Sequence, residues 1–100
     1  HALTRAIATD HGREAIRCNA ISPGWILTAL ADAAFDLAVD PAAARAATER
    51  RHPAGRMGTP DDIAGLAVYL ASSESSFVSG SCYTIDGGLT AQSPISPDDL

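Results

Sequence analysis

Residues 19–28 read Asn-Ala-Ile-Ser-Pro-Gly-Trp-Ile-Leu-Thr and carry the strongest structural signal in the chain. The mostly apolar or small run from Ile16 to Ile21 is typical of a parallel strand that is buried on both faces. Pro23 lacks the backbone donor that a strand ladder uses, so we expect the ladder to stop there. Open α/β sheets bind their ligands at the carboxyl ends of their strands. The sequence therefore predicts a ligand site at this Pro-Gly turn.

Helical patterns lie on both sides of this stretch. Apolar residues at helical spacing predict a helix over residues 1–10, with Gly12 as the left-handed residue that ends it. After the strand, which we expect over residues 16–22, helical composition predicts helices at 30–39 and 41–51. The second of these is almost all Ala and Arg on its face, so we expect it to dock weakly. A weakly docked helical pair beside a ligand site behaves as a lid.

The strongest helix start is Thr-Pro-Asp-Asp at residues 59–62, with a threonine cap, an early proline and acids that suit the helix dipole. An apolar stripe then repeats at helical spacing and should face a sheet; it consists of Ile63, Leu66, Ala67 and Leu70. A second strand is expected at 81–85, closed by Asp-Gly-Gly at 86–88, which we interpret as a chain reversal. This β-α-β order predicts that the two strands are parallel neighbours.

Four motifs follow one another at residues 19–28, 53–64, 67–72 and 79–88, and they cover nearly the whole chain up to Leu89. In this pattern the sequence resembles the short-chain dehydrogenase/reductase family. The resemblance implies an α/β fold, here the C-terminal fragment of a doubly wound, Rossmann-type parallel sheet, two strands with helices. The Asp-Gly-Gly ending is similar to that of 3-oxoacyl-carrier-protein reductases and of sugar or secondary-alcohol dehydrogenases.

The resemblance also implies a cofactor site. In the family the first motif faces the nicotinamide of NAD or NADP, so Pro23, Gly24, Ile26 and Thr28 would bind the cofactor. A glycine directly after a strand lets a ligand approach the backbone. The Thr28 hydroxyl would bond the carboxamide or phosphate of the cofactor, and it can cap the next helix at the same time. Trp25 either faces the substrate or packs in the core or the lid.

The catalytic pair of the family, Tyr-x-x-x-Lys, is missing from this sequence, which contains no lysine, and so is the Gly-rich turn of the first strand. We therefore expect no catalytic residue here. The chain would be part of an NAD(P)-dependent oxidoreductase that interconverts an alcohol and a ketone or aldehyde by hydride transfer. It would supply the nicotinamide wall, the substrate lid and the oligomer surface. The alternative is a truncated, non-catalytic remnant that acts at most as an oligomerisation partner.

The expected organisation is simple. Residues 1–92 would form the C-terminal part of an NAD(P)-binding Rossmann domain, with the substrate lid at 29–51 and a mobile tail at 93–100. A homo-oligomer would form through the last helix and strand. We expect a cytoplasmic protein that acts on a small-molecule alcohol or carbonyl compound.

Charge and hydropathy argue against other partners. The formal net charge is −5, and the only basic cluster, residues 50–52, lies beside Glu49. We interpret that cluster as a solvated helix end, since a nucleic-acid surface needs many gathered cations. No apolar run approaches the roughly 18 residues of a membrane span. The sequence therefore predicts neither a nucleic-acid partner nor a membrane partner.

The remaining reactive side chains fit no catalytic or metal pattern. Cys18 and Cys82 lie on the expected strands and are predicted to be buried free thiols. Arg56 precedes the Gly-x-Pro turn, and the resemblance implies a structural or interface salt bridge for it. The histidines have no metal-ligand spacing and are expected at the surface; they are His1, His11 and His52. No metal site is predicted.

Overall fold

The computed structural model describes residues 1–94. Its elements are α1 (Ala2–His11), η1 (Gly12–Glu14), β1 (Ala20–Pro23), α2 (Ala29–Asp36), α3 (Pro41–Arg51), α4 (Pro60–Ala71), η2 (Ser73–Ser75), β2 (Cys82–Ile85) and η3 (Leu89–Ala91). Most of the predicted tail, from residue 95 onward, lies outside the described residues.

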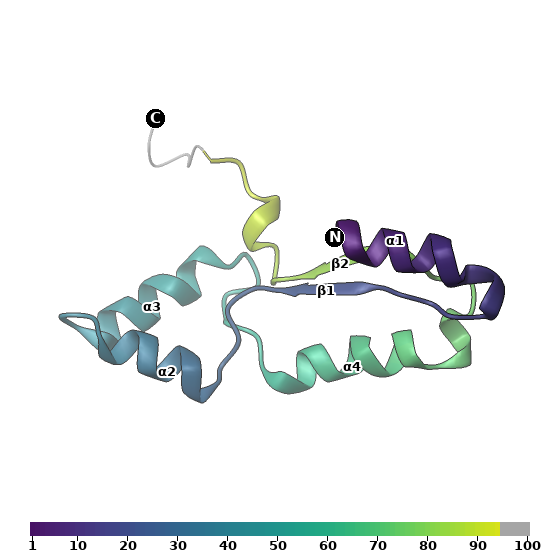
Figure 1. Ribbon diagram of the computed structural model, residues 1–100. Coiled ribbons are helices and arrows are strands. Elements are labelled where there is room, and N and C mark those ends of the chain that lie inside the picture. The colour runs from purple at the N-terminus through teal and green to yellow at the C-terminus, as the bar shows by residue number, and fades with distance from the viewer. Residues whose placement is uncertain (95–100) are drawn as a thin grey trace.

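The strands β1 and β2 are parallel neighbours, as predicted, with Ala20 opposite Cys82 and Pro23 opposite Ile85. Helix α1 lies on one side of this two-stranded sheet and α4 on the other, while the α2–α3 pair extends beyond the carboxyl end of β1 (Figure 1). The connection from β1 to β2 therefore forms the expected crossover. It places the α2–α3 pair next to the edge where a ligand is expected.

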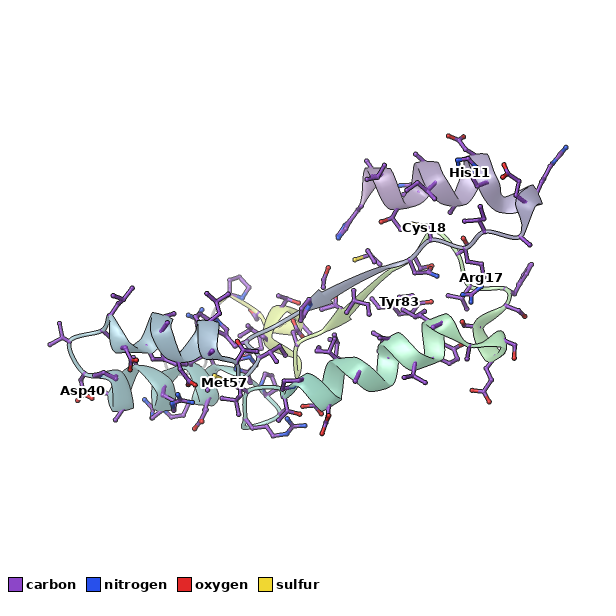
Figure 2. The ribbon with its side chains drawn as sticks, turned by 60° about the horizontal axis from the view of Figure 1, so that its bottom comes forward. His11, Arg17, Cys18, Asp40, Met57 and Tyr83 are labelled. Atoms are coloured by element: carbon purple, nitrogen blue, oxygen red, sulfur yellow. The ribbon has the colours of Figure 1, made fainter. Side chains whose placement is uncertain are left out.

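Strand β1 begins at Ala20, so the predicted start near Ile16 is wrong. The preceding residues are held by an irregular segment instead of a ladder: Cys18 N–H donates to Ser79 Oγ at 3.2 Å, and Gly80 N–H donates to the Cys18 carbonyl at 2.7 Å. Arg17 reinforces this contact at the end of the sheet (Figure 2), where its guanidinium donates to Ser75 Oγ at 3.0 Å. The apolar composition correctly indicated an extended chain, but this chain pairs with β2 only from Ala20 onward.

Two predicted helix ends also differ from the structure. Gly12 has φ −60° and continues the helical path into η1, whereas Ala15 takes the left-handed conformation with φ 59°. Ala15 N–H donates to the Gly12 carbonyl at 3.1 Å, which closes the turn. Helix α2 ends before residue 37, because Ala38 N–H donates to the Phe35 carbonyl at 2.9 Å and turns the chain.

The predicted helix starts are confirmed by their caps. Thr59 Oγ1 accepts from Asp62 N–H, and the Asp62 carboxylate accepts from Thr59 N–H at 2.7 Å, so the two residues form a capping box. Asp40 and Thr28 accept the backbone N–H of the third residue of α3 and of α2, at 2.9 and 3.3 Å. Each start depends on chemistry within four residues, which the sequence displays directly.

Asp62 has a second partner in Arg56, whose guanidinium donates to both carboxylate oxygens at 2.7 and 3.0 Å. A structural salt bridge was the role expected of Arg56. The Arg56 hydrogen bonds, together with those from Thr59, hold the pKa of the Asp62 carboxyl well below its usual range. The pair thus joins the 53–64 motif to the first turn of α4.

Acid is expected to weaken this junction. The Asp62 pKa is lower in the folded chain than in the unfolded chain, so between these two values the unfolded chain binds more protons and stability falls as pH falls. We expect the urea midpoint to drop below about pH 4. Asp62→Asn should be less stable at neutral pH and should lose part of that pH dependence, as followed by circular dichroism.

The matched control is Glu74→Gln, which removes an exposed acid on η2. It should leave both the midpoint and its pH dependence nearly unchanged. Identical pH slopes for the natural protein and Asp62→Asn would show that Asp62 does not contribute to acid destabilisation.

The buried apolar core of the described residues is small: Ala31, Phe35 and Met57. The radius of gyration is 17.1 Å, against about 13 Å for a compact domain of this length, so the chain is elongated. Figure 2 shows Met57 where the α2–α3 pair meets the rest of the chain. Helix α3 buries no residue and adds only the half-buried Ala44 to this core, in line with weak docking. Helix α2, in contrast, contributes two buried residues to the core, Ala31 and Phe35.

The apolar stripe of α4 is only half covered. Ile63, Leu66 and Leu70 are half-buried, whereas Ala67 is exposed. Tyr83 of β2 lies between the strands and α4 (Figure 2). None of the helices within residues 1–94 combines the length and the apolarity that crossing a bilayer requires.

Candidate functional site

A hollow of about 740 Å³ opens at the carboxyl ends of the two strands. Every predicted site residue lines it: Pro23, Gly24, Trp25, Ile26 and Thr28. The first turns of α2 close one side, and polar residues from the strands and from the turn after β2 close the other; these are Ser22, Thr84, Asp86 and Thr90. The structure brings the predicted residues together around one concave, mostly apolar wall, while their contacts with cofactor and substrate stay predictions.

Gly24 is required by the chain itself. A Cβ at this position would lie 2.8 Å from the Cβ and 2.9 Å from the Cα of Asp86. The bare backbone lets Gly24 N–H donate to the Ile85 carbonyl at 3.0 Å. Strand β1 ends at Pro23, as the sequence suggested, and the last hydrogen bond to β2 is donated by Gly24. The space that the missing Cβ leaves is filled by β2 and the turn after it.

The segment after the turn is joined to the 53–64 motif. Leu27 N–H donates to the Gly58 carbonyl and Gly58 N–H donates to the Trp25 carbonyl, both at 2.9 Å, around a bridge between Ile26 and Gly58. This pairing fixes the direction of the Trp25 and Ile26 side chains. No local signal in the sequence predicts that the 19–28 and 53–64 motifs lie side by side.

Thr28 caps α2, as the sequence suggested, and its role toward the cofactor stays a prediction. Its Oγ1 accepts the N–H of Ala31 at 3.3 Å and so caps α2. A hydroxyl has one proton and two lone pairs, so the Thr28 O–H remains able to donate into the hollow that it lines.

Trp25 packs on α2 and still borders the hollow. Its ring stacks on Phe35 with centroids 5.3 Å apart and an interplanar angle of 25°, and 41% of the residue is exposed. Arg45 of α3 lies over the Phe35 ring at 5.0 Å and also forms an ion pair with Asp32 of α2. The position of Trp25 in the site therefore depends on the α2–α3 pair.

The Asp-Gly-Gly turn is a chain reversal, as interpreted from the sequence. Gly87 and Gly88 have φ 61° and 86°, a region that favours glycine. The Asp86 carboxylate accepts from the Thr90 hydroxyl at 2.6 Å and from the backbone N–H groups of Thr90 and Gly88, both at 2.9 Å. These bonds, those of Thr90 first, lower the pKa of Asp86. Its charge is thus directed to its own turn.

His52 was expected at the surface and is buried, with 3% of the residue exposed. Its Nδ1 lies 2.8 Å from the Thr48 carbonyl, which can only accept, so Nδ1 carries the proton and Nε2 of the neutral ring is an acceptor. Nε2 has no hydrogen-bond partner among the described residues. His52 lies at the junction between α3 and Pro53, where no periodic pattern indicates burial. Only Arg50 and Arg51 of the basic cluster are exposed.

The thiols are free, as predicted, but Cys82 is exposed and Cys18 only half-buried, so the expected burial is wrong. The side of the sheet that faces α1 is only loosely covered at Cys82, whose Sγ lies 2.9 Å from His1 Nε2. His1 and His11 are exposed, as expected. No group of His, Cys, Asp and Glu in the described part of the chain could hold a metal ion.

The geometry defines a class of protein. A parallel β-α-β unit with an apolar-walled hollow at its strand ends and a helical pair beside it is typical of Rossmann-type sheets, which bind their ligands at the carboxyl edge. The sequence model of the family described as Enoyl-(Acyl carrier protein) reductase matches residues 1–90. The chain belongs to the short-chain dehydrogenase/reductase family.

Known relatives agree with this assignment. The chain is 47% identical over 87 residues to the 2-keto-3-deoxy-L-fuconate dehydrogenase of Xanthomonas campestris pv. campestris. The aligned segment is 86% of the chain and 29% of that protein. The ligand-free structure of Thermoplasma acidophilum aldohexose dehydrogenase matches with a TM-score of 0.88 and 37% identity, over 95% of the chain and 39% of its own. A 4-hydroxyisoleucine dehydrogenase complexed with NADH matches with a TM-score of 0.80 and 35% identity, over 92% of the chain and 36% of that structure. The chain spans about a third of the length of the curated relatives it matches.

Proposed function

We propose that the chain forms the C-terminal part of an NAD(P)-dependent oxidoreductase that interconverts an alcohol and a ketone or aldehyde. The observation that carries the proposal is the hollow at the strand ends, around which Pro23, Gly24, Trp25, Ile26 and Thr28 meet. The relatives support it, since two are sugar or sugar-acid dehydrogenases by name and one structure is a complex with NADH. Residues 1–92 would belong to the Rossmann domain.

The residues of the hollow fit a nicotinamide. Pro23 and Ile26 offer an apolar wall for a flat ring, and the free O–H of Thr28 suits a carboxamide or phosphate oxygen. The bound dinucleotide would supply hydride exchange at the substrate carbon. The group that exchanges the proton is a tyrosine paired with lysine in this family, and the sequence contains no lysine. In this site the chain would bind and orient the cofactor and the substrate.

Residues 29–51 would act as the substrate lid. The α2–α3 pair borders the hollow through Leu30, Ala31 and Ala34, and Phe35 anchors it to Met57. Trp25, stacked on Phe35, would face the substrate with its open side. A lid that packs on the core at one end and has few buried contacts at the other can close over a ligand without unfolding.

Removing the Thr28 hydroxyl is expected to weaken cofactor binding. Thr28→Val loses the donor to the cofactor and the cap of α2, whereas Thr28→Ser keeps both groups. We expect the Kd for NADH or NADPH, measured by fluorescence titration of the natural protein, to rise about 5- to 30-fold in Thr28→Val and to stay near the natural value in Thr28→Ser. Equal affinities for all three proteins would remove Thr28 from the site.

The activity itself is tested with the natural protein that carries this sequence. NADH and NADPH should be oxidised in the presence of some members of a panel of ketones, aldehydes and oxo acids, and failure with the whole panel would refute the proposed reaction. The 100-residue chain alone should show no turnover, because it lacks the Tyr and Lys pair. Turnover by that chain would contradict the division of labour proposed above.

The last helix and the last strand, α4 and β2, would form a homo-oligomer contact, and the protein would be cytoplasmic. Val68, Tyr69 and Phe77 are exposed apolar side chains of this region. The two cysteines are free, as in a reducing compartment. Sedimentation equilibrium of the natural protein should give a mass above that of one chain; a monomer at every concentration would refute the contact.

A further inference from the structure

A second, smaller hollow of about 360 Å³ adjoins the candidate site. It is lined by Trp25, Thr48, Arg51, His52, Leu89 and Thr90. Trp25, Leu89 and Thr90 also line the larger hollow, so the two spaces share a wall. A liquid water occupies about 30 Å³, so the smaller hollow has room for the head of a small organic molecule. We refer to it as the side chamber.

Arg51 brings an unneutralised charge to the side chamber. Arg45 and Arg56 pair with Asp32 and Asp62, but within residues 1–94 the Arg51 guanidinium has no ion pair. The Arg51 carbonyl accepts a hydrogen bond from the Gln92 amide, which fixes the last turn of α3 beneath the side chain. A guanidinium presents several N–H donors in one plane and matches a carboxylate with two parallel bonds.

Asp86, in the turn after β2, does not compete for this charge. Asp86 accepts hydrogen bonds from Thr90 and Gly88, so its carboxylate is already directed to its own turn. Arg51 is thus a cation at the chamber wall whose partner would have to come from a ligand or from solvent.

His52, another lining residue of the chamber, holds a buried ring nitrogen that lacks a partner. Its Nδ1–H donates to the Thr48 carbonyl, and its buried Nε2 has no partner among the described residues. A buried polar atom without a partner is costly, and native proteins rarely tolerate one. A hydroxyl group, or a water that a hydroxyl holds in place, would supply the missing donor. The wall therefore offers a cation for an anion, next to a histidine whose acceptor lacks a donor.

We propose that the side chamber is a carboxylate subsite, and that the substrate of the enzyme is a small hydroxy or oxo acid. The inference rests on the proposed function and specifies its substrate class. The carboxylate binds Arg51, a hydroxyl of the acid completes the hydrogen bonding near His52, and the reacting carbon lies past Trp25 in the larger hollow. A planar carboxylate suits one guanidinium, whereas a doubly charged phosphate would call for a second strong cation, and among the described residues no other arginine lines the chamber.

The test compares acid and neutral substrates of the same shape. The natural protein, Arg51→Gln, Arg51→Lys and the control Arg50→Gln are assayed with a 3-hydroxy acid, with its amide and with a phosphate monoester of a diol. Arg50 is the neighbouring arginine and does not line the chamber. Arg51→Gln should lower kcat/KM for the acid about 10- to 100-fold and leave the amide unchanged. Arg51→Lys should recover part of the loss, and Arg50→Gln should change either value less than about threefold.

A binding measurement tests the carboxylate subsite separately from the proposed reaction. Calorimetric titration of the protein with the 3-hydroxy acid should show binding that Arg51→Gln weakens about 10-fold or more. His52→Leu should weaken it too, and His52→Gln should restore it in part, because the glutamine amide still offers an oxygen acceptor. Absence of turnover with every substrate, with Arg51-dependent acid binding intact, would refute the proposed reaction alone. Equal losses for acid and amide, or preference for the phosphate monoester, would overturn the carboxylate subsite.

Discussion

Phe35→Ala is expected to destabilise the protein by about 3–5 kcal/mol, the largest effect of any single side-chain truncation in the described chain. Phe35 is 5% exposed and packs with Ala31 and Met57 in the only apolar core cluster among residues 1–94. Trp25 stacks on its ring, and Arg45 lies over it. A cavity at this point loosens the base of the α2–α3 pair, because Ala31 and Met57 lose the ring against which they pack.

Denaturant unfolding of the natural protein measures this effect. The control Leu37→Ala removes a side chain of similar size that is 89% exposed just past the end of α2, and it should change stability by no more than about 0.5 kcal/mol. Phe35→Leu keeps most of the buried volume and should cost about 1–2 kcal/mol. If Phe35→Ala and Leu37→Ala gave similar small losses, the α2–α3 pair would not be anchored at Phe35.

The same substitution should affect the substrate more than the cofactor. Trp25 loses its stacking partner in Phe35→Ala, while Pro23 and Thr28 keep their places in the turn. The KM for substrate should therefore rise more than the Kd for NADH. The opposite order would mean that the lid helps to hold the cofactor.

Features with a local cause were predictable from the sequence. The caps at Thr28, Asp40 and Thr59 depend on side chains and N–H groups three residues apart. The parallel pairing of β1 and β2 followed from the order strand, helices, strand. The candidate site residues lie in one contiguous run after a strand, so any fold that ends the strand there brings them to the same edge.

Features with a distant cause were not predictable. His52 is buried because the end of α3 lies against the turn after β2: its Cδ2 is 3.7 Å from the Cβ position of Gly87. Thirty-five positions separate these two residues (87 minus 52), and neither has a pattern that points to the other. The side chamber arises from this same approach, so the sequence indicated the proposed nicotinamide wall but not the proposed carboxylate subsite.

Gly24→Ala should cost about 2–3 kcal/mol and should also impair cofactor binding. The new methyl would lie 2.8 and 2.9 Å from Asp86 Cβ and Cα, and backbone held in a ladder cannot move aside as the end of a side chain can. Relief requires that the ends of β1 and β2 separate, which breaks the 3.0 Å bond from Gly24 N–H to the Ile85 carbonyl. The wall of the hollow then moves as well, since Pro23 and Asp86 both line it.

Two other glycines make this prediction specific. At Gly58 the added methyl would meet Ile26 Cδ1, the flexible end of a side chain, at 2.6 Å, so Gly58→Ala should cost less than Gly24→Ala. At Gly65, inside α4, nothing lies within 4 Å of the Cβ position, and Gly65→Ala should stabilise the helix by about 0.5–1 kcal/mol. Urea midpoints and NADH titrations of the three variants should follow this order. A Gly24→Ala protein as stable as Gly65→Ala would mean that the strand ends are free to separate, and that the edge around which the site is built is not rigid.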